Sequence, residues 1–91
     1  MALREIKFHL VQPEEFFKLK EDIVAKYPQA AGIAEGVPFD TGKMGYKLTY
    51  RYLGTDLVID VDGPSMFMGS AVTSVQDMVF DFIGSHSVSG A

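Results

Sequence analysis

The alternation of apolar and polar residues near the N-terminus predicts a half-buried β-strand over residues 4–11. Ile6, Phe8 and Leu10 fall on one face, and polar residues separate them. A period of two places such residues on the same side of an extended chain. Pro13 follows, with two glutamates after it. A helix is expected to begin there, because proline fits the first helical position and acidic side chains are favoured in the first turn.

Residues 13–27 carry the spacing of an amphipathic helix, and Pro28 ends the pattern. The following segment, residues 29–45, holds four glycines and Pro38, too many breakers for a long regular element. We expect a loop there, and a short edge strand over Gly36–Phe39 is left open. The apolar stripe of the predicted helix consists of Phe16, Leu19, Ile23 and Tyr27.

Two further alternating runs, residues 46–53 and 56–61, predict a β-hairpin. Gly54 and Thr55 lie between them, and glycine at the first central position suits a type II′ turn. A second amphipathic helix is expected from Ser70, a favourable capping residue, to a stop at Gly84. Its stripe consists of Val72, Val75, Val79 and Phe82.

These elements predict one α+β domain over residues 1–84, followed by a flexible tail over residues 85–91. The tail is rich in serine and glycine and shows no periodicity. We expect a three- to four-stranded antiparallel sheet with two amphipathic helices packed on one face, in the order β-α-(β)-β-β-α. The other sheet face would stay exposed. It would carry charged residues, and the apolar residues Val58 and Leu53 would lie among them.

Composition restricts the function classes. The chain has 91 residues, of which 47% are hydrophobic, and it has no cysteine, which excludes disulfides and thiolate chemistry. The net charge of -4, with the basic residues dispersed, argues against nucleic acid as a partner. No apolar run reaches the length of about 18 residues that a transmembrane helix needs. The N-terminus lacks a secretory signal, so a cytoplasmic location is expected.

No residue pattern identifies catalysis, a metal site or a cofactor. The Asp60–Gly63 segment lacks the later ligands of a calcium loop, and Thr41–Lys43 lacks the spacing of a phosphate loop. His9 and His86 are the only histidines, and we expect both to be exposed bystanders. Enzymatic activity is left undecided, with a non-catalytic role favoured.

Three large apolar residues, Met66, Phe67 and Met68, stand between Pro64 and Gly69. An extended segment cannot direct all three into one core. They are therefore candidates for contact with a ligand or partner, because methionine adapts to irregular surfaces. The alternative is that they close one end of the core. The alternation of the first hairpin strand adds three residues expected beneath a helix, Tyr46, Tyr50 and Tyr52.

The order of strand, helix, meander, apolar segment and helix resembles the small bacterial polyhydroxyalkanoate-system proteins found with storage granules. The resemblance is carried by Ile6, Phe8 and His9, by the hairpin over residues 46–62, and by residues 66–83. It implies a non-enzymatic accessory protein with an apolar contact surface.

Two functions follow as hypotheses. The first is a small non-catalytic accessory protein that binds a partner or an apolar surface near Met66–Met68 and self-associates as a homodimer. The alternative is a small-molecule binding domain, with modest enzymatic activity left open, whose pocket lies between helix and sheet. The pocket would be lined by Tyr46, Tyr50, Tyr52, Met66 and Met68.

Overall fold

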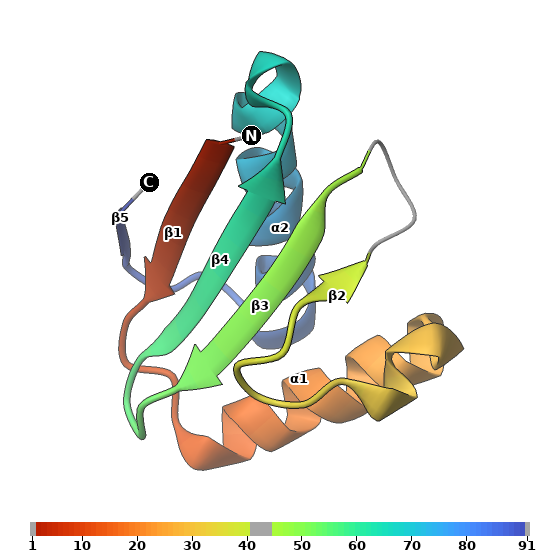
Figure 1. The fold of residues 1–91 in the computed structure, drawn as a ribbon. Coiled ribbons are helices and arrows are strands. Elements are labelled where there is room, and N and C mark those ends of the chain that lie inside the picture. Colours follow the sequence, from red (N-terminus) through yellow and green to blue (C-terminus); the bar gives the residue numbers. More distant parts are fainter. Residues whose placement is uncertain (1, 41–44, 91) are drawn as a thin grey trace.

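The structure, a computed structural model, describes residues 2–40 and 45–90. Within these residues, five strands form one antiparallel sheet in the order β2-β3-β4-β1-β5, and two helices cover one of its faces (Figure 1). The strands are β1 (Ala2–Phe8), β2 (Phe39–Asp40), β3 (Lys47–Tyr52), β4 (Leu57–Gly63) and β5 (Val88–Gly90). The helices are α1 (Pro13–Lys26) and α2 (Met68–Ile83), and two short 3-10 helices, η1 (Pro28–Gly32) and η2 (Ser65–Phe67), lie between strands and helices.

The α+β class, the antiparallel sheet and the two helices on one face are confirmed, but the predicted number of strands is too low. One additional strand is β2. Of the possible strand over Gly36–Phe39, only Phe39 belongs to β2, which continues to Asp40. Just before it, the amide of Gly36 donates to the carbonyl oxygen of Tyr50 at 3.0 Å. This segment therefore runs along the free edge of β3.

The other additional strand, β5, comes from the residues predicted to be a flexible tail. It pairs with β1, opposing Val88 to Phe8 and Ser89 to Lys7. Side chains add to this pairing, since His9 Nε2 lies 2.7 Å from Ser89 Oγ. The structure therefore has a strand within residues 85–91, where no regular element was predicted. The sequence did not indicate it, because three residues are too few to show a period.

Strand β1 is shorter at its C-terminal end than the predicted range of residues 4–11. Leu10 has a left-handed backbone, with φ of 58°, and its side chain is 68% exposed. The amide of Val11 then donates to the carbonyl oxygen of Thr55 at 2.8 Å. The chain thus turns after Phe8, and Leu10 leaves the buried face on which alternation had placed it.

Both helices bury the first part of their predicted stripes, but Ile23 and Phe82 are only half-buried, and Tyr27 lies just beyond the end of α1. Helix α1 begins at Pro13 as expected, and the Gln12 amide donates to Glu15 Oε1 at 3.0 Å in the manner of a capping box. Helix α2 begins at Met68, two residues earlier than predicted, and ends where Gly84 adopts a positive φ of 82°. The buried stripe of α2 consists of Met68, Val72, Val75 and Val79.

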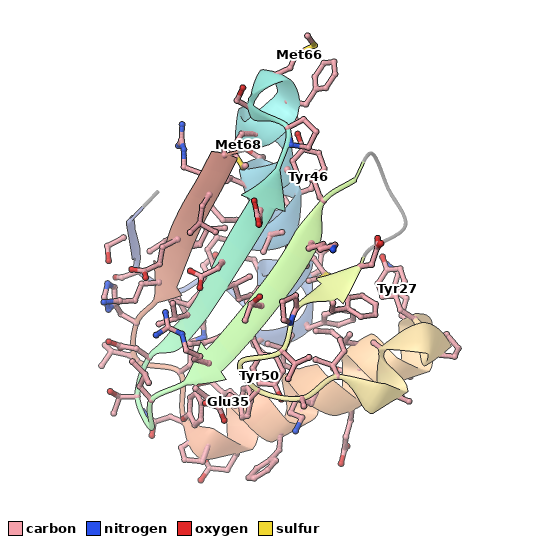
Figure 2. All side chains as sticks on the ribbon, in the orientation of Figure 1. Tyr27, Glu35, Tyr46, Tyr50, Met66 and Met68 are labelled. Atoms are coloured by element: carbon pink, nitrogen blue, oxygen red, sulfur yellow. The ribbon has the colours of Figure 1, made fainter. Side chains whose placement is uncertain are left out.

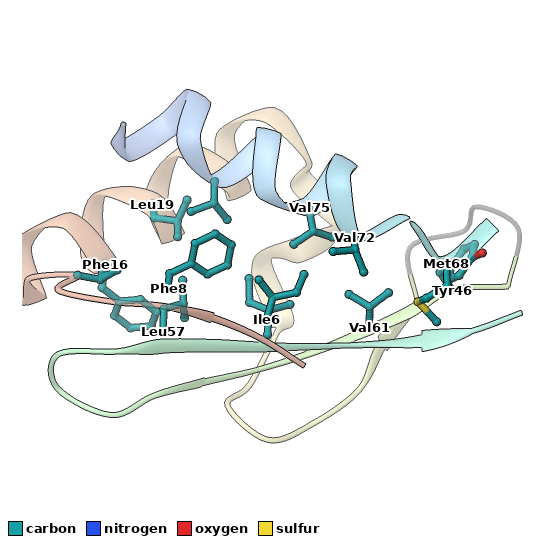
Figure 3. Close-up of a cluster of buried hydrophobic side chains, with 13 residues drawn as sticks. Ile6, Phe8, Phe16, Leu19, Tyr46, Leu57, Val61, Met68, Val72 and Val75 are labelled. Atoms are coloured by element: carbon teal, nitrogen blue, oxygen red, sulfur yellow. The ribbon is translucent and has the colours of Figure 1, made fainter. Parts of the chain in front are cut away.

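The core is more completely filled beneath β1 and β4 than beneath β3. Helix α2 makes its most extensive sheet contacts with β1 and β4, whereas α1 packs mainly on α2 and η1. Figure 3 shows the side chains of both helices directed toward the sheet. The inward residues Ile6 and Val61 are fully buried, but Leu48 and Tyr50 of β3 are only half-buried. Burial therefore decreases across the sheet toward β3.

The opposite face of the sheet carries charged side chains. Arg51 Nη2 lies 3.5 Å from Glu5 Oε2 and 3.7 Å from Asp60 Oδ2. Val58 lies on this face but is only 2% exposed, because Lys7 and Arg51 flank it in the register. The apolar surface that we expected Val58 to contribute is therefore covered by its own neighbours.

Candidate functional site

A cavity of about 510 Å³ lies between α1, α2 and the β3 side of the sheet. Its floor is formed by inward residues of β3 and β4, such as Leu48 and Ile59. Phe16 and Ile23 line it from α1. The wall at the sides is completed by Tyr27, Ala30, Ala31, Ile33, Phe39 and Phe67. The cavity is partly open to solvent, and it extends from the half-buried inward residues of β3 to the buried inward residues of β4.

The cavity exists because short side chains face it from α2. Ser70, Ala71 and Ser74 line it, and Val75 lies beside them. Ser74 lies four positions after Ser70 and three after Ala71, so it neighbours both on the helix surface, and the three form a patch of low volume. Longer side chains there would fill the space between α2 and β3.

Tyr46, which precedes β3, forms one end of the wall. Its ring is nearly fully buried, and its hydroxyl donates to the carbonyl oxygen of Pro64 at 2.9 Å. The ring lies against Gly63, where an added Cβ would stand 2.3 Å from Tyr46 Cδ1. Glycine is thus required at position 63 for the tyrosine to occupy this place.

Tyr50 lies farther along the same wall. Its ring centroid is 5.9 Å from that of Phe16, and its side chain is half-buried. In the part of the chain that the structure describes, its hydroxyl makes no hydrogen bond. A ligand that reached this hydroxyl would not have to displace a protein partner among the described residues.

Tyr52 does not line the cavity but holds α1 against the sheet. Its ring stacks on Phe16 with centroids 4.3 Å apart and planes 9° apart. Its hydroxyl proton is shared between the carbonyl oxygens of Val11, at 2.6 Å, and Gly54, at 2.8 Å. Burial raises the pKa of the Tyr52 phenol above its usual range, and the carboxylates of Glu14 and Glu15 add to the increase.

The three apolar residues around η2 point to different places. Met66 is 80% exposed, and Figure 2 shows it at the tip of the molecule, while Met68 is buried in the core. Phe67 is 46% exposed and borders the cavity. Of the six predicted contact residues, the structure brings Tyr46, Tyr50 and Phe67 together around the cavity. It places Tyr52, Met66 and Met68 outside the lining.

Most of the lining is formed by residues without reactive side chains, which were not among the predicted contact residues. Ala71 and Ser74 interrupt a stripe of large apolar residues on α2, and this break in side-chain size is the signal that could have indicated a cavity. Ile33 and Phe39 come from the segment treated as a loop. Lys20 of α1 also borders the cavity.

The two histidines lie at the C-terminal strand, away from the cavity. His86 Nε2 is 3.0 Å from Glu15 Oε2, and His9 Nδ1 is 3.4 Å from Asp56 Oδ1. Over residues 2–40 and 45–90, no three acidic, histidine or cysteine side chains are grouped as metal ligands would be. Neither described helix has the length and apolar character needed to cross a lipid bilayer.

Comparison of the chain with protein-family models, with curated proteins and with solved structures gave no match.

Proposed function

We propose that this protein is a binding domain for an apolar small molecule, which occupies the cavity between α1, α2 and β3. The observation that carries the proposal is the cavity volume of about 510 Å³. Sites for small molecules usually measure about 300–1,000 Å³ and combine apolar walls with a few polar groups. This one is lined mainly by aliphatic and aromatic residues, with hydroxyl groups on Ser70, Ser74 and Tyr50.

Packing energetics support the same proposal. Protein interiors are normally filled to the density of organic crystals, and side chains around an empty space lose dispersion contacts. A bound apolar molecule would restore those contacts for residues such as Leu48 and Ile23, which are packed against the core but remain partly exposed. Burial of the ligand would supply the driving force.

The proposal is tested with the neutral dye Nile red and with Ala71→Phe. Ala71 faces the cavity from α2, so a phenyl ring there should occupy ligand volume. We expect the wild-type protein to enhance dye fluorescence with saturation at one dye per chain, and Ala71→Phe to bind about tenfold more weakly or not at all.

Thr73→Phe is the matched control, because Thr73 is exposed on the same helix and does not line the cavity. Thermal unfolding would establish that both variants are folded. Equal dye binding by Ala71→Phe and Thr73→Phe would show that the dye does not enter this cavity, and the proposal would then fail.

A second candidate function is supported by the exposed apolar surface at η2. Met66 and Phe67 are 80% and 46% exposed, and this is the surface that the likeness to polyhydroxyalkanoate-system proteins would use for contact. The corresponding proposal is a non-catalytic accessory protein that forms a homodimer through these residues. The absence of cysteine in the sequence suits a reducing compartment such as the cytoplasm.

Met66→Ser separates this second candidate from the first. Because Met66 is exposed and outside the cavity, its replacement should leave thermal stability and dye binding unchanged. If the surface mediates dimerisation, sedimentation velocity should show a wild-type dimer that the variant weakens. A wild-type monomer at all concentrations would contradict the dimer.

A further inference from the structure

The described lining of the cavity contains very few charged groups, and this restricts the chemical class of ligand that it would bind. Among the described residues that line it, Lys20 is the only lysine, arginine, histidine, aspartate or glutamate. The remaining polar groups of the lining are hydroxyls of serine and tyrosine. An apolar chamber with one cation and no carboxylate complements a molecule that is mostly hydrocarbon and carries one negative charge.

Along α1, no acidic side chain lies at a position that could pair with the ammonium of Lys20. The positions three and four residues away on either side are Phe16, Phe17, Ile23 and Val24, and these are the positions that could form ion pairs along a helix. By contrast, the neighbouring Lys18 pairs with Asp22, with Nζ 2.6 Å from Oδ2.

Contacts of the side chain agree with this. Lys20 Nζ lies 5.6 Å from the centroid of the Phe16 ring, a cation–π distance, and it forms no ion pair within the described residues. A lysine can extend its aliphatic stem along apolar surface while its ammonium group remains hydrated. At the border of a cavity, this geometry offers a charged end next to an apolar interior.

We infer that the ligand is an amphiphilic monocarboxylate whose hydrocarbon part fills the cavity and whose carboxylate pairs with the ammonium of Lys20. This inference rests on the proposed function. A single ammonium suits one carboxylate, whereas a phosphate dianion would be expected to need further cations, and the described lining supplies none. A cationic amphiphile would be repelled by Lys20.

The test is isothermal titration calorimetry with three ligands that share one chain: dodecanoate, dodecanol and dodecylammonium, each below its micelle concentration. The wild-type protein should prefer dodecanoate. Lys20→Met keeps the stem and removes the charge, and it should weaken dodecanoate binding about tenfold while leaving dodecanol binding nearly unchanged.

Lys7→Met is the control for the loss of one positive charge. Lys7 belongs to β1 and lies on the opposite face of the sheet, beside Val58, so this variant should bind dodecanoate like the wild type. Retained Nile red binding by Lys20→Met would show that its cavity is intact.

The possible failures are distinguishable. If Lys20→Met binds dodecanoate as tightly as the wild type, or if dodecanol binds as tightly as dodecanoate, the carboxylate contact is wrong while the cavity remains a binding site. If neither Nile red nor any of the three amphiphiles binds, both the inference and the proposed function are overturned.

Discussion

Replacing Gly63 with alanine should destabilise the fold by forcing Tyr46 out of its place. The added Cβ would lie 2.3 Å from Tyr46 Cδ1 and 2.8 Å from Cε1. Carbon atoms that are not bonded normally approach to about 3.5–4.0 Å. The ring would therefore have to move by more than about 1 Å in a region where it is almost fully buried.

Two costs arise from that movement. Overpacking of a core usually costs about 1–3 kcal/mol. A ring displaced this far would also lose the hydrogen bond from its hydroxyl to the Pro64 carbonyl oxygen, now 2.9 Å long, which is worth about 1 kcal/mol. We therefore expect a loss of about 2–4 kcal/mol in the free energy of unfolding, equivalent to at least about 8 °C in Tm for a domain of this size.

The assay is urea denaturation followed by circular dichroism. Gly69→Ala is the matched control, because an added Cβ at Gly69 meets nothing within 4 Å and the residue lies in α2. Alanine is favoured over glycine in helices, so this variant should be as stable as the wild type or slightly more stable. In a Tyr46→Ala background, Gly63→Ala should lose most of its cost.

The reasoning would be refuted if Gly63→Ala unfolded at the wild-type urea concentration. It would also be refuted if the cost were the same with and without the Tyr46 ring, because the contact between residues 63 and 46 would then not be its source. Since Tyr46 lines the cavity, Gly63→Ala should weaken Nile red binding as well, and Gly69→Ala should not.

Two other predictions concern residues that hold the elements together. The raised pKa of Tyr52 means that its phenol loses a proton at lower pH in the unfolded chain than in the folded one, so stability should decrease as pH rises through about 10. In Tyr52→Phe the drop in Tm between about pH 9 and about pH 11 should be smaller, and an equal drop would contradict the assignment. Replacing His86 with alanine removes its contact with Glu15 and should cost about 1 kcal/mol while accelerating hydrogen exchange in β5. Unchanged exchange there would show that His86 does not hold the strand.

The sequence predicted the elements that are long enough to show a repeating pattern of apolar residues. The two hairpin strands alternate, and α1 and α2 carry apolar stripes, because one side of each element is buried. All four of these elements are present. Strands β2 and β5 have two and three residues, and their position depends on backbone bonds to β3 and β1. Leu10 continues the apolar alternation of β1 in the sequence, but the strand does not reach it because the backbone turns there.

The candidate site was only partly accessible to such reasoning. Alternation placed Tyr46 and Tyr50 on the inward side of the hairpin, and both line the cavity. The volume of the cavity depends on how α1 and α2 pack on each other and on the sheet, which no local pattern encodes. Met66 and Met68 could not be distinguished because η2 turns the chain between strand and helix, so neighbours in the sequence point in different directions.

The three inward tyrosines around β3 differ in how firmly their hydroxyl groups are held. The outer two are fixed, since the hydroxyl of Tyr46 binds Pro64 and that of Tyr52 lies between two carbonyl oxygens. Tyr50 lies between them with a hydroxyl that has no partner among the described residues. Fixed walls reduce the ordering cost of binding, and a free donor gives a ligand one polar group to reach. Tyr46 therefore fixes one end of the cavity wall and Tyr52 holds the Phe16 ring of that wall, while the hydroxyl of Tyr50 stays available to the proposed ligand.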